Sequence, residues 1–387
     1  MPVIDVAPPA YMADEEIAIF ADAVGKFYQK HAPEQRVRQW REDGQVERGF
    51  WREAGEAGLL GASVPEEYGG HGGDFRHEMV VLEQQGKHGV DGFSASLHNT
   101  IILPYLVRHG TEEQKKRYLP RLVSGDLVSA IAMTEPGVGS DLQSIATTAL
   151  KDGNGYRING TKTYISNGQI ADFIIIVAKT DPAEKAKGIS LMLLETEGAE
   201  GFERGRKLDK IGLDAQDTSE LFFDDVFVPG DAVLGGEEGR GFYQLMGELP
   251  QERLVIAMGA MEVISRALDE TVAFTRERKA FGQTVWDFQN TQFTIADLKA
   301  RGTAARVFLD DCIAKHLKGE LDVPTACMAK YWLTELQGEV VDKCLQLHGG
   351  AGYINDYPIA RMFRDSRISR IFGGSNEIMK MVIARSI

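Results

Sequence analysis

The sequence has 387 residues, which is enough for a large buried core and for two or three domains. Hydrophobic residues make up 43%, an ordinary globular composition, and 57 acidic against 43 basic side chains give a formal net charge of −14. This excess of acid argues against a general nucleic-acid or anionic-membrane surface, because both require a basic face.

The number and spacing of the cysteines and the composition of the N-terminus bear on the cellular compartment of the protein. Cys312, Cys327 and Cys344 lie in sequence of helical character without CxxC spacing, which favours buried thiols in a reducing environment. No apolar run reaches the ~18–20 residues that a membrane span needs. Residues 1–5 lack the basic and apolar parts of a signal peptide. We therefore expect a cytoplasmic protein without a membrane span.

The first third of the chain has the apolar spacing of helices, from about residue 14 to residue 125. A long apolar helical stretch is expected over 77–109, and a loop at 64–70 interrupts the section. Pro120 and Gly125 are expected to close it. The three- and four-residue steps are clearest at Ile17, Phe20, Val24 and Phe27.

The middle of the chain, about 127–234, has the alternation and turn residues of strands. The segment 155–165 alternates around Asn-Gly pairs, which predicts a hairpin. Continuous apolar runs at 173–178 and 189–194 predict buried strands, and 221–229 closes the set.

The helical period returns from about residue 239 to the end, and four amphipathic segments with short connections predict a bundle. This α–β–α order is not a βαβ alternation, so a doubly wound fold is unfavoured and an α+β multidomain fold is expected. The predicted bundle helices are 241–279, 289–318, 324–348 and 375–386. The predicted domains are an N-terminal α-helical domain at 1–127, a central β-barrel or sandwich at 128–236, and a C-terminal four-helix bundle at 237–387.

Several common enzyme motifs are absent from the sequence, including HExxH, GxxxxGK and GxSxG. The stretch 137–139 lacks the third glycine of a dinucleotide fingerprint and opens no helix in a βαβ unit, so a Rossmann site is a poor interpretation. The histidines are not spaced as metal ligands, and we expect no metal.

The segment 132–141, Ala-Met-Thr-Glu-Pro-Gly-Val-Gly-Ser-Asp, carries the first positive signal. It is a strand end that runs into a glycine-rich loop with free hydroxyls and backbone N–H groups. Such a loop can approach a flat polar ring or a phosphate closely. From these residues alone, a plain turn between strands is an equally good interpretation.

The sequence resembles the acyl-CoA dehydrogenase family over essentially its whole length. Segment 132–141 looks like the first signature of that family, and the further matches occur in family order: Tyr164-Ile165-Ser166, Arg278-Lys279-Ala280-Phe281-Gly282, Gln346-Leu347-His348-Gly349-Gly350 and Phe372-Gly373-Gly374-Ser375. The segments 249–253 and 371–380 most resemble long-chain members. The isovaleryl-type members of the family also carry the catalytic base on the helix that corresponds to the predicted helix 241–279.

The resemblance implies FAD between the β-domain and the bundle, a homotetramer, an acyl-CoA substrate and an electron-transferring flavoprotein as acceptor. Arg278 would reach the pyrophosphate of a neighbouring subunit's FAD, a role that suits a guanidinium. The implied FAD contacts are Ile131, Ala132, Met133, Thr134, Gly139, Ser140, Tyr164, Ile165, Ser166, Arg278, Gln289, Gln346, Leu347, His348, Gly349, Gly350, Ser375, Asn376 and Glu377.

The catalytic base is expected at Glu252. The position that often carries a glutamate in this family holds Gly373, which would keep its N–H for the thioester oxygen and lose only the carboxylate. Burial beside a flavin would raise the pKa of Glu252 above its reference value, and Arg253 would oppose this unless its guanidinium points elsewhere. The implied substrate contacts are Ser140, Tyr243, Pro250, Gln251, Glu252, Arg253, Gly373 and Gly374.

Three alternatives stay open at this point. Glu252 and Arg253 could form a surface charge pair on a helix. The chain could be a non-catalytic subunit that binds FAD or acyl-CoA. It could also be an oxidase or monooxygenase on the same scaffold. The favoured function is dehydrogenation of a medium- or long-chain or branched acyl-CoA to a trans-2-enoyl-CoA.

Overall fold

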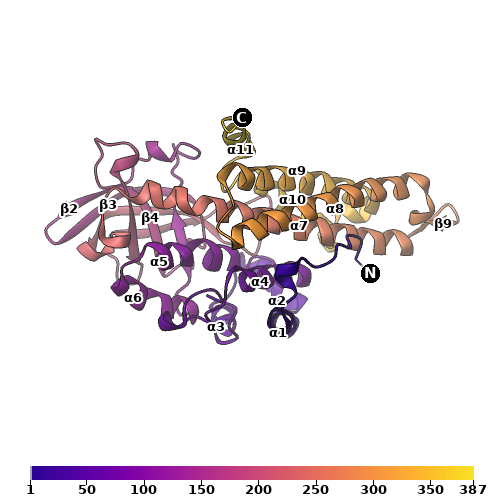
Figure 1. The fold of residues 1–387 in the computed structure, drawn as a ribbon, viewed down its shortest axis with the longest axis horizontal. Coiled ribbons are helices and arrows are strands. Elements are labelled where there is room, and N and C mark those ends of the chain that lie inside the picture. Colours follow the sequence, from indigo (N-terminus) through magenta and orange to yellow (C-terminus); the bar gives the residue numbers. More distant parts are fainter. Residues whose placement is uncertain (1) are drawn as a thin grey trace.

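The computed structural model describes residues 2–387 and shows a helical part, a β part and a second helical part in chain order (Figure 1). The first part folds around its own apolar core, in which Trp40, Phe50 and Trp51 are fully buried. Its elements are α1 (Glu15–His31), α2 (Glu34–Asp43), α3 (Arg48–Glu56), α4 (Phe75–His88), a π-helical segment (Ser96–Ile102), α5 (Leu103–His109) and α6 (Glu112–Val123).

The long helix predicted at 77–109 is wrong as a single element. Helix α4 ends at His88 because Gly89 adopts a left-handed conformation, with φ 64°, and its N–H caps carbonyls of the last turn. The chain then loops to the π-helical segment, which continues directly into α5. Pro120 does not end a helix either: it lies inside α6, and Gly125 turns the chain after that helix with φ 75°.

The β part is a seven-stranded curled sheet in which β1, β4 and β5 form one portion and β2, β3, β7 and β6 the other. A single residue pair, Thr148 with Lys179, joins the two portions. Both faces of β4 are buried, one against α5 and α6 and the other against β3 and β7, which explains its unbroken apolar run. The strands are β1 (Ser129–Ala132), β2 (Thr148–Asp152), β3 (Gly155–Ser166), β4 (Phe173–Lys179), β5 (Ile189–Glu195), β6 (Phe202–Lys207) and β7 (Thr218–Pro229).

The hairpin predicted within 155–165 has its turn before this segment and not inside it. Asp152 pairs with Gly155, so residues 153–154 form the turn, and β3 runs on as one strand of 12 residues. The Asn159-Gly160 pair sits at a register shift against β7, where the strand bulges. The Asn159-Gly160 pair, which is typical of a turn, therefore forms a bulge within β3 and not a turn.

The second helical part contains α7 (Gly241–Glu277), α8 (Gln289–Leu317), α9 (Val323–His348), α10 (Pro358–Ser366) and α11 (Asn376–Ala384). The three long helices share one core with Ile359 and Met362 of α10. The segment predicted at 375–386 as the fourth bundle helix is helical, but α11 lies outside that core, against α9 (Figure 1). The short α10 completes the bundle instead.

Two further features bear on the site. A hairpin of β8 (Lys279–Ala280) and β9 (Gln283–Thr284) follows α7, and it lies at the opposite end of the molecule from β2 and β3 (Figure 1). Between residues 2 and 387, every helix is too short or too polar to cross a lipid bilayer.

Candidate functional site

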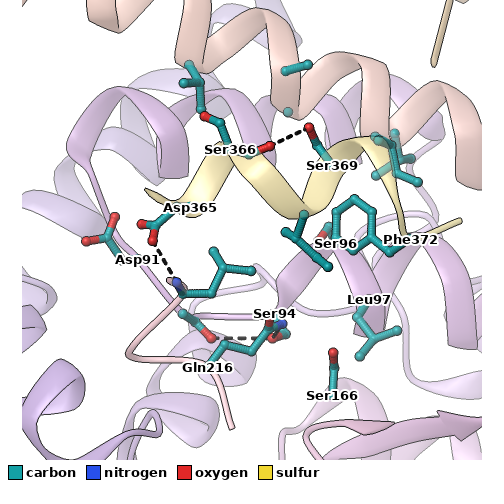
Figure 2. A pocket seen from close by; sticks show the side chains of 18 of the residues that line it. Asp91, Ser94, Ser96, Leu97, Ser166, Gln216, Asp365, Ser366, Ser369 and Phe372 are labelled. Atoms are coloured by element: carbon teal, nitrogen blue, oxygen red, sulfur yellow. Dashed lines mark hydrogen bonds between the residues drawn. The ribbon is translucent and has the colours of Figure 1, made fainter. Parts of the chain in front are cut away.

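A cavity of about 500 Å³ lies where the three parts meet, and it falls in the range of small-molecule sites. One wall comes from the sheet, a second from α10 and the segment that follows it, and a third from α4, α7, the loop after α4 and the π-helical segment. Figure 2 shows Ser166 facing this space from the sheet, with Ser366, Ser369 and Phe372 on the opposite side.

The sheet wall presents apolar surface with hydroxyls at its edge. A register shift in β3 between Lys162 and Ile165 leaves Tyr164 with φ 59° and 68% exposed, which turns its ring towards the cavity. Neither Thr134 nor Ser166 uses its side-chain hydroxyl in a hydrogen bond within residues 2–387. The members of this wall are Ile131, Met133, Thr134, Tyr164, Ile165 and Ser166.

A buried ion pair holds the sheet wall from behind. Lys162 is completely buried, and its Nζ donates to Glu135 Oε1 at 2.8 Å and to the Met133 carbonyl at 2.9 Å. The Glu135 carboxylate also accepts from the backbone N–H of Ala146 and Thr147. This pair is not apparent from the sequence, because nothing in the local pattern marks a lysine in β3 as buried.

The opposite wall is fixed by polar contacts between elements. Asp365 Oδ1 accepts from the Leu213 N–H at 2.6 Å, and Gln216 Nε2 donates to Ser94 Oγ at 2.6 Å (Figure 2). Ser369 Oγ donates to Gln337 Oε1 at 2.7 Å. The first and third bonds tie α10 and the segment after it to the loop before β7 and to α9, and the second joins that loop to the one after α4.

Glu252 of α7 is buried, with 5% exposure, and lines the cavity. Its Oε1 accepts a hydrogen bond from the Tyr105 hydroxyl at 2.9 Å, and Tyr105 is itself buried behind the cavity wall. Arg253 is buried as well and points away, towards Cys327 Sγ at 3.2 Å. The interpretation of Glu252 and Arg253 as a surface charge pair is therefore wrong.

Burial raises the pKa of Glu252 to about 7, since the charged form loses its water. The Tyr105 hydrogen bond opposes this rise because it stabilises the carboxylate, whereas the nearby Glu248 adds to it by charge repulsion. The Arg253 charge lowers the pKa least, in keeping with its direction away from the carboxylate. A group in this state can hold or release a proton near neutral pH.

Helix α5 fixes the first turns of α7 around this glutamate. Glu248 is buried, ion-paired with Arg108 and hydrogen-bonded to His109 Nε2 at 3.0 Å. Gln251 accepts from Arg108 Nη2 at 2.6 Å and donates to the Thr100 carbonyl at 2.7 Å. Gln251 therefore lines a second cavity of about 270 Å³ and not the one that Glu252 faces.

Gly373 faces Glu252's cavity from the other side, in a backbone conformation that favours glycine. Its φ is 62°, and a Cβ at this position would lie 2.2 Å from Ile256 Cδ1. Its N–H donates to no acceptor within residues 2–387. A free donor thus borders the same space as the buried carboxylate.

The cavity brings together part of the predicted site. The predicted residues that line it are Ile131, Met133, Thr134, Tyr164, Ile165, Ser166, Glu252 and Gly373. Ala132 is buried in the sheet, Gly139, Ser140, Tyr243 and Glu377 are exposed outside the cavity, and Pro250, Arg253, Gly374 and Ser375 also lie outside its lining. Asn376 is buried, and its amide bonds to Thr334 and Glu335 of α9.

The remaining predicted cofactor contacts lie at the far end of the bundle. Arg278 directly follows α7 and Gln289 begins α8, and both are exposed. At 1.5 Å per residue, Arg278 is roughly 39 Å along the helix from Glu252. Gln346, Leu347, His348, Gly349 and Gly350 lie at the end of α9, with Leu347 and His348 packed inwards. None of these residues lines the cavity of its own chain.

Comparison with known proteins identifies the family. Residues 14–126, 130–226 and 239–387 match the N-terminal, middle and C-terminal domain models of acyl-CoA dehydrogenase in turn. The mitochondrial long-chain specific acyl-CoA dehydrogenase of Sus scrofa is 47% identical over 371 residues, which cover 95% of this chain and 86% of the relative. The chain belongs to the acyl-CoA dehydrogenase family.

Other relatives agree with this acyl-CoA dehydrogenase in sequence and fold. The mitochondrial isovaleryl-CoA dehydrogenase of Pongo abelii is 37% identical over 376 residues, covering 96% of this chain and 88% of the relative. The crystal structure of an acyl-CoA dehydrogenase from Geobacillus kaustophilus is 46% identical and superposes with a TM-score of 0.95, covering 98% and 99% of the two chains. The predicted family and the predicted three-domain fold are confirmed.

Acyl-CoA dehydrogenases are FAD-dependent oxidoreductases, and the cavity of this one fits the cofactor. A flavin ring needs apolar contact on its faces and hydrogen-bonding groups at its edge. The sheet wall offers both: the exposed ring of Tyr164 with the largely buried Ile165 next to it, and the unpaired hydroxyls of Thr134 and Ser166 beside them. These residues would hold the flavin.

Proposed function

We propose that this acyl-CoA dehydrogenase converts a medium- or long-chain or branched acyl-CoA to a trans-2-enoyl-CoA, with Glu252 as the base. The carboxylate would remove a proton from the carbon next to the thioester carbonyl. The supporting observation is a buried glutamate that lines the cavity, with a pKa of about 7. A base of this kind is half deprotonated near neutral pH.

The chain supplies three functions in this reaction. Glu252 accepts the proton, and Tyr105 holds one carboxylate oxygen from behind so that the other is free to face the ligand. The unpaired N–H of Gly373 would donate to the thioester oxygen as negative charge develops there. FAD, when bound, supplies the acceptor for the hydride that leaves the next carbon.

The direct test is Glu252→Gln, compared with Glu277→Gln at the exposed end of the same helix. Glutamine keeps the size of the side chain and removes its basicity. We expect FAD to stay bound and anaerobic bleaching of the flavin by acyl-CoA to slow by orders of magnitude in Glu252→Gln alone. Near-normal bleaching would reject Glu252 as the base, and absence of bleaching in the wild-type protein would favour a non-catalytic binding subunit.

The same protein preparation can be used to distinguish an oxidase or monooxygenase from a dehydrogenase. Wild-type protein that consumes oxygen or releases peroxide during turnover would support the oxidase alternative. We propose an electron-transferring flavoprotein as the natural acceptor, and reduction of such a flavoprotein by substrate-reduced enzyme is the measurement that tests it.

We also propose a homotetramer in the cytoplasm. The distant Arg278 and Gln289 support the assembly, since they can meet FAD only in another copy of the chain. Phe281 at the same end is 96% exposed with φ 52°, which suits a side chain that inserts into a partner. A sedimentation measurement on wild type and Phe281→Ser tests this: the variant should dissociate and lose FAD.

A further inference from the structure

The cavity has an arm that runs between α4 and α7, away from Glu252. The α7 residues along it recur at helical spacing: Glu252, Ile256, Gly259, Val263 and Arg266. At 1.5 Å per residue, the first and last of these are roughly 21 Å apart along the helix. One acyl tail spans about 15 Å, half the hydrocarbon core of a bilayer. The arm is therefore long enough to hold a long acyl chain.

The middle of this arm is apolar and open. Gly259 is exposed within the cavity, and a Cβ built on it would have no atom within 4 Å. Glycine costs a helix interior about 1 kcal/mol relative to alanine, so its presence here is explained by the space that it leaves. Val255, Ala260 and Val263 border the same space. This section suits methylene groups.

The far end of the arm is different, because it holds a guanidinium without hydrogen-bond partners. Arg266 lines the arm and makes no hydrogen bond within residues 2–387. Its ion-pair partner is Glu270, with Nε and Oε1 3.9 Å apart. The guanidinium lies over Gly89, where a Cβ would come within 2.4 Å of Nη1. Arg266 is thus held against the end of α4 with its donors unused.

A buried acceptor lies behind the wall of the same arm. Gln85 lines the arm one turn before Gly89, and its Nε2 donates to the carbonyls of Val90 and Phe93, which fixes the orientation of the amide. Its Oε1 is buried and has no partner. Since this atom has almost no accessible surface, it does not face the arm, and polar recognition of a ligand at this end falls to Arg266.

The other charges at this end are already balanced. Asp91 accepts from Arg41 at 2.6 Å and lies 3.8 Å from Arg361. Burial and the charge of Glu83 raise the pKa of Glu262, which favours its neutral form. Asp365 accepts from the backbone. Arg266 therefore remains available to a ligand.

We propose that the end of this arm is a subsite for an oxygen function at the far end of a long acyl chain. Arg266 would donate to that oxygen. The inference rests on the proposed function, because it places the thioester beside Glu252. The enzyme would then prefer ω-oxygenated long-chain acyl-CoAs over their methyl-ended counterparts.

The test compares palmitoyl-CoA, ω-hydroxypalmitoyl-CoA and hexadecanedioyl-CoA as substrates of the FAD-loaded enzyme. We expect kcat/KM to favour at least one oxygenated chain by about tenfold, the size of one charge-assisted hydrogen bond. Arg266→Leu should abolish this advantage and keep turnover of palmitoyl-CoA, whereas Arg276→Leu, on the exposed end of the same helix, should keep both. Octanoyl-CoA and ω-hydroxyoctanoyl-CoA are too short to reach Arg266 and should not be distinguished.

Two further measurements keep the outcome clear. Calorimetric titration of the Glu252→Gln holoenzyme with the same thioesters measures affinity without turnover, so a failure of the proposed chemistry does not hide the subsite. Gly259→Leu should block the long chains and spare octanoyl-CoA, which checks that the chain follows this arm. Equal affinity and equal kcat/KM for methyl-ended and oxygenated long chains, or an unchanged ratio in Arg266→Leu, would overturn the subsite.

Discussion

Replacing Tyr105 by phenylalanine should move the pH at which the enzyme becomes active. The Tyr105 hydroxyl donates to Glu252 Oε1 at 2.9 Å in a buried setting, so it stabilises the carboxylate more than the protonated acid. Phenylalanine keeps the ring and removes this donor. The folded-state pKa of Glu252, about 7 in the wild type, should therefore rise further.

The expected size follows from the strength of the bond. A hydrogen bond to a charged group contributes about 1.5–3 kcal/mol. One pKa unit corresponds to about 1.4 kcal/mol, so the shift should be about one to two units. At pH 7 the deprotonated fraction of the base, and with it kcat/KM, would fall about five- to fiftyfold. The loss should be largely recovered at alkaline pH, where the base is again ionised.

The assay is kcat/KM against pH with an artificial electron acceptor, which reports the pKa of the free enzyme's base. Tyr28→Phe is the matched control, because the Tyr28 hydroxyl is equally buried but has no hydrogen-bond partner. An acid limb at the same pH in Tyr105→Phe and wild type would refute the reasoning. A uniform loss of activity at every pH would show that Tyr105 acts only on the structure.

Three other substitutions test neighbouring contacts. Glu248→Gln removes a charge that raises the pKa of the base, so the acid limb of kcat/KM should move to lower pH, and a limb that moves upwards would contradict this. Gly373→Ala sets a Cβ against Ile256 at φ 62° and should lower the free energy of unfolding in urea by about 1–3 kcal/mol, partly restored by adding Ile256→Ala. Lys162→Met leaves Glu135 buried without its cation and should cost about 3–5 kcal/mol in the same assay; an unchanged urea midpoint would contradict this.

The order of the three parts and the strands at 173–178 and 189–194 were predictable, because apolar periodicity and composition are local properties of the chain. The family motifs placed Glu252 and Gly373 as candidates, and the structure brings both to one cavity. Their catalytic roles remain predictions.

The parts that the sequence could not supply depend on long-range packing. Tyr105 meets Glu252 across 147 residues of chain, and within its own helix it looks like any core tyrosine. The Asn159-Gly160 signal was overridden by pairing with β7. The fourth bundle helix was misassigned because α10 is short, and only its contacts with α7 and α9 identify it as part of the core.

One uninterrupted α7 has an evolutionary consequence. Each residue added to a helix turns everything beyond it by about 100°. A one-residue insertion between Glu252 and Arg266 would rotate Arg266 away from the cavity that Glu252 lines. Drift in chain-length preference must therefore proceed by exchange of side chains along this segment, whereas gain or loss of residues should be confined to loops elsewhere.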